Sequence, residues 1–155
     1  MLDVSIINEV IEIINKNDML IIDKDLSRKK KINIVRSLFE IIEDDKIEPY
    51  INFQKYPTNQ LLRVFSFNER NLTLIKLTKE NVQINNYKLD NIELIKFYLQ
   101  KEKGTSAKLT LMIKLKKDEN INITERFGLS NKNDLIPNYT EHKLYLFYKD
   151  LMKFL

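Results

Sequence analysis

The sequence predicts an α+β protein in which two N-terminal helices precede a bent antiparallel sheet of about six strands, closed by a C-terminal amphipathic helix. Three observations predict this class. Apolar residues recur at helical spacing before residue 45 and again after residue 143. Between these regions, residues 108–116 alternate between polar and apolar side chains, with Met112 as the exception, which is typical of a half-buried strand.

The chain divides into three stretches of different character. Residues 1–45 are expected to form a helical part, and residues 61–155 a β-rich part with the C-terminal helix. Residues 46–60 contain Pro49 and Pro57 and show no sustained period, which predicts a linker. A length of 155 residues suits one domain, so we expect residues 1–155 to fold as a single domain.

The helical part contains two amphipathic patterns. The first runs from Asp3 to Asp18, with Asp3 or Ser5 as the candidate N-cap. The second ends near Asp45 and carries apolar residues on more than one side, so it is expected to be the more buried helix. The apolar positions are Ile6, Ile7, Val10, Ile13 and Ile14 in the first pattern, and Ile32, Val35, Leu38, Phe39 and Ile42 in the second.

Four basic residues, Arg28, Lys29, Lys30 and Lys31, begin the second helix, and acidic residues end it. The helix dipole favours the opposite order by about 0.3–1 kcal/mol per exposed charge, so packing must hold this helix. The basic residues form a candidate site for phosphate or for a carboxylate-rich partner. The simpler interpretation is a solvated helix start.

The β-rich part begins with short apolar runs at 61–67, 72–78 and 81–84, separated by polar turn sequences. A long hairpin follows at 92–117, and one more strand at 119–127. Keeping the apolar residues of the hairpin on one face requires paired residue numbers to sum to an even value. The loop around Gly104 must therefore contain an odd number of residues, and a loop of three is expected. A change of phase near Leu94 and Ile95 predicts a β-bulge.

The last helix is marked by Leu144, Phe147, Tyr148 and Leu151 on one face. Asn138 and Glu141 form a capping-box-like pair ahead of it. This succession of an antiparallel meander and a C-terminal amphipathic helix resembles the pleckstrin-homology-like architecture, a strongly bent half-barrel. The resemblance covers about residues 61–155 and rests on the order of the elements.

Catalytic groups are scarce. The chain has no cysteine and a single histidine, His142, whose place in the first turn of a helix is typical of a surface residue. Its two glycines stand alone, which excludes a P-loop and the dinucleotide-binding fingerprint. Asp23 and Asp25 could join a distant carboxylate in a cation site, and Glu102 with Lys103 resembles part of a nuclease motif, but both patterns are common by chance. We therefore predict no catalytic residue, no metal site and no cofactor.

Charge gives the clearest functional signal. The formal net charge is +4. Residues 92–117 contain seven lysines and two acidic residues, a local excess larger than that of the whole chain. Period-2 geometry places the candidate binding residues of this stretch on one face of the hairpin. They are Lys96, Tyr98, Lys108, Lys114 and Lys116.

Two hypotheses follow, and a third is weaker. The leading one is a non-enzymatic binding module, such as a small regulatory, immunity-type or phage-type factor, that engages a protein partner with an acidic surface. The alternative is binding of nucleic acid or anionic lipid through the basic face of the hairpin, although only one aromatic residue accompanies the lysines. Lysines that only keep the sheet soluble would look similar. The weaker alternative is a metal-dependent enzyme.

The N-terminus resembles no secretory signal, because it carries Asp3 where a signal peptide is basic and its apolar run is interrupted by Asn8, Glu9 and Glu12. No apolar run approaches the roughly 20 residues that cross a bilayer. We therefore expect a cytoplasmic protein that does not span a membrane.

Overall fold

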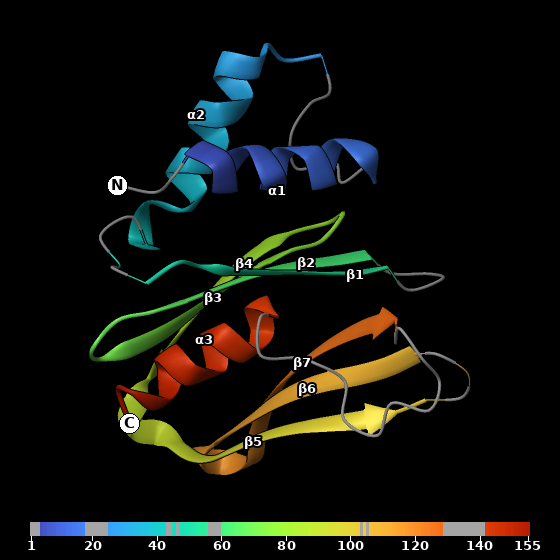
Figure 1. Ribbon diagram of the computed structural model, residues 1–155. Coiled ribbons are helices and arrows are strands. Elements are labelled where there is room, and N and C mark those ends of the chain that lie inside the picture. Colours follow the sequence, from blue (N-terminus) through green and yellow to red (C-terminus); the bar gives the residue numbers. More distant parts are fainter. Residues whose placement is uncertain are drawn as a thin grey trace. The chain divides into compact units, whose positions relative to one another are not determined.

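A computed structural model describes residues 4–17, 25–42, 45, 47–55, 60–102, 104, 106–128 and 142–155. Within them lie three α-helices and two antiparallel sheets of four and three strands, which confirms the α+β class (Figure 1). The chain groups into two compact units, Met1–Tyr87 and Lys88–Leu155. The boundary falls inside the predicted β-rich part.

The first unit begins with helices α1 (Val4–Lys16) and α2 (Arg28–Leu38), followed by a short 3-10 turn at Glu40–Ile42. The Ser27 side chain caps α2 by accepting a hydrogen bond from the Lys30 backbone N–H. Contrary to expectation, α1 is the more buried helix. Five of its residues are buried, whereas α2 itself buries only Val35. The remaining apolar residues of the second pattern either follow the helix, as Phe39 does, or are half-buried.

The first sheet has the strand order β1 (Tyr50–Lys55), β2 (Gln60–Phe67), β3 (Asn71–Leu77) and β4 (Val82–Lys88). Its central strands bury both faces, because every residue from Leu62 to Phe67 is buried. The two helices lie over one face of this sheet (Figure 1). The core between helices and sheet consists of Ile6, Ile7, Val10, Ile11, Ile14, Val35, Phe39, Ile42, Leu62, Val64, Ile75 and Leu77.

The predicted linker at 46–60 contains strand β1, which is a correction to the sequence analysis. Ile51 and Phe53 pack towards the helices, while Tyr50 and Asn52 are buried on the opposite face. Apolar Ile51 and Phe53 do alternate with polar Asn52 and Gln54, but this alternation spans only four residues between two prolines, which favoured a linker. Pro57 lies outside the described residues.

In place of the expected single bent sheet of about six strands, the described residues form seven strands in two sheets. The chain leaves β4 through a 3-10 turn at Leu89–Asn91 and enters the second sheet, where β5 (Ile92–Lys101), β6 (Ser106–Leu115) and β7 (Glu119–Gly128) pair in that order. A tight turn at Lys116–Asp118, in which Lys117 and Asp118 have positive φ, joins β6 to β7.

The hairpin register confirms the sequence analysis. Phe97 pairs with Leu111 and Lys101 with Ala107, so paired numbers sum to an even value. The register shifts between Ile92 and Leu94, close to the predicted bulge. Gly104 adopts a φ of 82°, which favours glycine. Its neighbours in the loop, residues 103 and 105, lie outside the described residues.

The core of the second unit lies on the odd-numbered face of this sheet. Leu109, Leu111 and Ile113 are fully buried, and Ile121 and Ile123 of β7 extend the same row. Helix α3 (Lys143–Met152) contacts β6, and its residues Leu144, Phe147 and Leu151 are buried. The Phe97 ring stacks on Tyr148 with centroids 4.7 Å apart.

Helix α3 has an N-cap that the sequence analysis did not predict. His142 Nδ1 accepts a hydrogen bond from the Leu144 N–H at 3.1 Å. The predicted capping pair, Asn138 and Glu141, lies outside the described residues. Within the ranges that the structure describes, none of the three α-helices is long and apolar enough to cross a membrane.

Candidate functional site

The even-numbered face of the second sheet collects most of the predicted binding residues. Pairing of β5 with β6 and of β6 with β7 arranges this face as four rows of three residues. In order, the rows are Leu94, Lys114 and Asn120; Lys96, Met112 and Asn122; Tyr98, Thr110 and Thr124; and Gln100, Lys108 and Arg126. We call these twelve residues the even-numbered face.

The structure places four of the five hairpin candidates on this face: Lys96, Tyr98, Lys108 and Lys114. Lys116 is exposed, but it lies after the end of β6 in the turn to β7 and so belongs to none of the four rows. The period-2 pattern located the first four because each sits within a regular strand. It placed Lys116 wrongly because the strand ends one residue earlier.

Strand β7 contributes residues that the sequence analysis missed. Asn120, Asn122, Thr124 and Arg126 form the third column of the even-numbered face. The signal was available, because Ile121 and Ile123 were expected to point inward and their even-numbered neighbours must then point the other way. What the sequence lacked was the strand order that puts β7 beside β6.

The even-numbered face has a centre and a rim. Thr110 is only 3% exposed and lies beside Tyr98 and Met112. Its hydroxyl is 3.5 Å from that of Thr124. Lysines and an arginine lie around this centre: Lys96 on β5, Lys114 in one end row, and Lys108 with Arg126 in the other. None of the twelve positions is acidic.

An acidic residue, Glu102, reaches this face from outside it. Glu102 follows β5, and its Oε1 accepts a hydrogen bond from Arg126 Nε at 3.0 Å. Because this pair is largely solvated, its contribution to stability is small. It does reduce the positive charge at the row that contains Lys108, so the lysines carry most of the positive field on this face.

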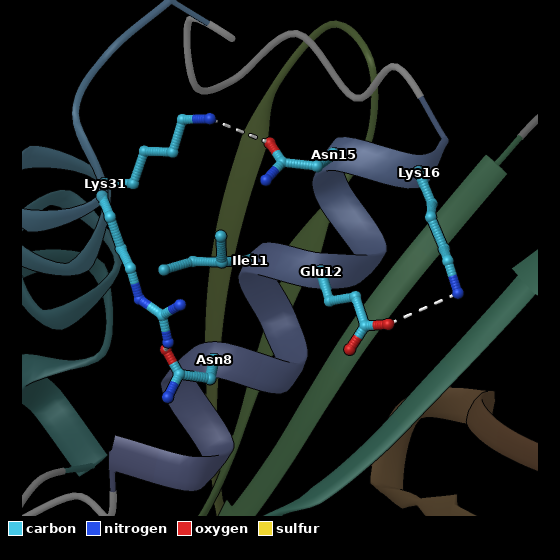
Figure 2. A pocket seen from close by; sticks show the side chains of 7 residues that line it. Asn8, Ile11, Glu12, Asn15, Lys16 and Lys31 are labelled. Carbon is cyan, nitrogen blue, oxygen red and sulfur yellow. Dashed lines mark hydrogen bonds and ion pairs between the residues drawn. The ribbon is translucent and has the colours of Figure 1, made fainter.

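Two of the four basic residues at the start of α2, Arg28 and Lys31, have a structural role. Arg28 Nη2 donates to Asn8 Oδ1 at 3.1 Å, and Lys31 Nζ donates to Asn15 Oδ1 at 3.3 Å. Figure 2 shows Lys31 directed at Asn15 on α1, and separately the Glu12–Lys16 ion pair within α1. These contacts join α2 to α1.

Between α1 and α2 lies a shallow groove of about 470 Å³, which Arg28 and Lys31 help to line. Lys29 and Lys30, by contrast, are exposed and do not line it. Of the four predicted basic residues, two therefore fasten the helix pair and two face solvent. The groove opens to solvent, and Arg28 and Lys31 already bond to Asn8 and Asn15 across it.

No group of three or more histidine or acidic side chains suited to a metal ion occurs within the described residues. Asp25 is exposed, and Asp23 lies outside those residues. The comparisons with known proteins give no family, because no family model, curated protein or solved structure matches the chain.

Proposed function

We propose that this protein is a non-enzymatic binding module that docks the even-numbered face of its second sheet on an acidic surface of a partner protein. A small regulatory, immunity-type or phage-type factor would act in this way. The observation that carries the proposal is the composition of the face: Lys96, Lys108, Lys114 and Arg126, with no acidic residue among the twelve positions.

The arrangement of these residues supports a protein as the partner. Interfaces between proteins commonly have a centre containing aromatic residues and methionine, surrounded by a polar and charged rim. Here Tyr98 and Met112 lie near the centre, next to Thr110, and the basic residues lie around them. Acidic groups on the partner would meet this rim, which speeds association and fixes orientation.

The order of the elements also supports a proposal about the fold. A four-stranded sheet, a three-stranded sheet and a C-terminal helix follow one another from Tyr50 to Met152. This order resembles the pleckstrin-homology-like architecture. It includes β1, which lies before the residues 61–155 for which the sequence predicted the resemblance. We propose that the protein is a variant of this architecture preceded by two helices. Architecture alone does not define the ligand, so the function rests on the surface residues.

Binding of nucleic acid or anionic lipid is the alternative for the same lysines. Single-strand platforms stack bases on two or three aromatic residues, and the even-numbered face has only Tyr98. The composition of the face therefore favours a protein. Binding to a single-stranded oligonucleotide or to acidic vesicles at about 50 mM salt would support the alternative instead.

The test is affinity capture from the native host with three versions of the full chain. The first is unchanged, and the second carries K96E, K108E and K114E. The third, a matched control, carries the same change of charge at the exposed residues Lys55, Lys79 and Lys88, which belong to no candidate site. We expect one partner to be retained by the first and third chains and lost by the second. A partner that the second chain retains equally well would overturn the proposal.

A further inference from the structure

The second sheet has two edge strands, and they differ. Strand β5 pairs with β6 on one side, and within the described residues no other strand pairs with its opposite side. An antiparallel edge strand directs alternate backbone N–H and C=O groups away from the sheet. With ten residues, β5 presents a long edge that can template another strand.

The apolar residues of β5 are incompletely covered. Ile95, Phe97 and Leu99 face the core side but are only half-buried. Their partners across the strand pair, Ile113, Leu111 and Leu109, are fully buried. The odd-numbered residues of β7, Ile121 and Ile123, are 5% and 0% exposed. The core is therefore closed along these positions of β7 and left partly open along β5.

The charge beside this edge is positive. Lys96 lies on the even-numbered side of β5, with Lys108 and Lys114 on the neighbouring strand. The only acidic residue of β5 is Glu93, which lies at the bulge. A strand added to this edge would place alternate side chains next to the lysines and the others over the half-buried apolar residues.

Edge strands are commonly protected by lysines and bulges, and β5 has both. The bulge disturbs only one end of the strand, because the register shift lies between Ile92 and Leu94, whereas Lys96 and Lys101 lie along the rest. From Leu94 to Lys101 the pairing with β6 continues without a shift. This segment of eight residues, roughly 26 Å long at 3.3 Å per residue, is regular enough to pair with another strand.

We propose that an extended segment of the partner protein adds to β5 along Leu94–Lys101 and becomes a fourth strand of the second sheet. The inference rests on the proposed function, since it names how the acidic partner is held. The segment alternates apolar residues, which cover Ile95, Phe97 and Leu99, with acidic residues, which face Lys96 and the even-numbered side. Main-chain hydrogen bonds supply affinity, and the alternation supplies specificity.

The probe is a synthetic peptide of alternating glutamate and valine, capped at both ends and long enough to span the segment. Its control has the same composition with all glutamates at one end. We expect binding to the full chain with amide-exchange protection along β5, and at least about tenfold weaker binding of the control. N-methylation of the alternate peptide amides that point toward β5 should abolish binding. N-methylation of the other amides, which point away from β5, should leave binding unchanged.

Three results would overturn the inference. They are no binding by the alternating peptide, equal binding of the two peptides, and insensitivity to N-methylation of either set of amides. If the inference alone is wrong, the charge-reversed chain still loses its captured partner while β5 gains no protection from the peptide. If the proposed function is wrong, the charge-reversed chain keeps the partner.

Discussion

The two sheets are built from the same kinds of strands but expose their faces differently. In the first sheet, β2 and β3 bury neighbouring residues on opposite faces, as Leu74 and Ile75 show with 1% and 0% exposure. In the second sheet, β6 buries Ile113 completely and leaves Lys114 half-buried on the other face. The first sheet is therefore dominated by packing, and the second keeps a chemically distinct face that can serve recognition.

The largest effects are expected from substitutions of adjacent residues in β3 and β6, because adjacent side chains in a strand point to opposite faces of the sheet. Leu74→Ala and Ile75→Ala should each lower the free energy of unfolding by about 2–5 kcal/mol, because both create cavities. In β6, Ile113→Ala should cost a similar amount, while the neighbouring substitution Met112→Ala should cost clearly less. Denaturant unfolding measures all four. A mild effect of Leu74→Ala, comparable to that of Met112→Ala, would contradict the contrast between the sheets.

The next largest effect concerns polar side chains, which are buried in the first sheet at Asn52 and exposed in the second at Asn122. In the first sheet Asn52 is 1% exposed and accepts hydrogen bonds from Arg63 Nε and Nη2 at 3.3 and 2.8 Å. Removing an acceptor from a buried charged group costs about 1.5–3 kcal/mol, so Asn52→Ala should destabilise by that amount.

The matched control is Asn122→Ala on the even-numbered face. This residue is exposed, so the change should stay within about 0.5 kcal/mol. Thermal or denaturant unfolding of both variants compares them. Equal losses of stability would show that the even-numbered face is as tightly constrained as the first sheet.

The smallest effects are expected at the turns. Between β2 and β3, Asn68 Oδ1 accepts from the backbone N–H groups of Arg70 and Asn71 at 2.8 and 2.9 Å. Asn68→Ala removes both bonds, together with the longer bond that Asn68 Nδ2 donates to Asp45 Oδ1 at 3.3 Å, and should cost about 1 kcal/mol. Unfolding of this variant in denaturant gives the value, and no loss of stability would mean that the two bonds are not limiting.

Between β6 and β7, Lys117 and Asp118 have φ values of 69° and 60°, which strain residues other than glycine. The pair Asn-Gly is favoured where both turn residues have positive φ. The double variant with Lys117→Asn and Asp118→Gly should therefore stabilise the protein by about 1 kcal/mol. A lower melting temperature for this variant would show that the turn depends on contacts of the native side chains.

The sequence predicted most where a strand has one buried face. Alternation located β6, the hairpin register and four of the five hairpin candidates, because polar side chains mark the solvated side directly. It did not identify β1, because the alternation of Ile51 and Phe53 with Asn52 and Gln54 spans only four residues between two prolines. It also missed Arg126, since only the strand order places β7 beside β6.

The helices show a second limit of sequence patterns. The apolar residues after Arg28 predicted a deeply buried helix, yet several of them follow α2 or are half-buried. The four basic residues at its start form one sequence cluster but have two roles. Helical geometry directs Arg28 and Lys31 to α1, and Lys29 and Lys30 to solvent. A linear cluster cannot distinguish these roles.

The most direct test of the central claim is the affinity of the captured partner for the unchanged chain and for the chain with K96E, K108E and K114E. We expect about a 100-fold or greater loss of affinity, because three attractive contacts with an acidic surface become repulsive. Unchanged melting temperatures would show that both chains are folded. Equal affinities for the partner would contradict the claim that the even-numbered face is the recognition surface.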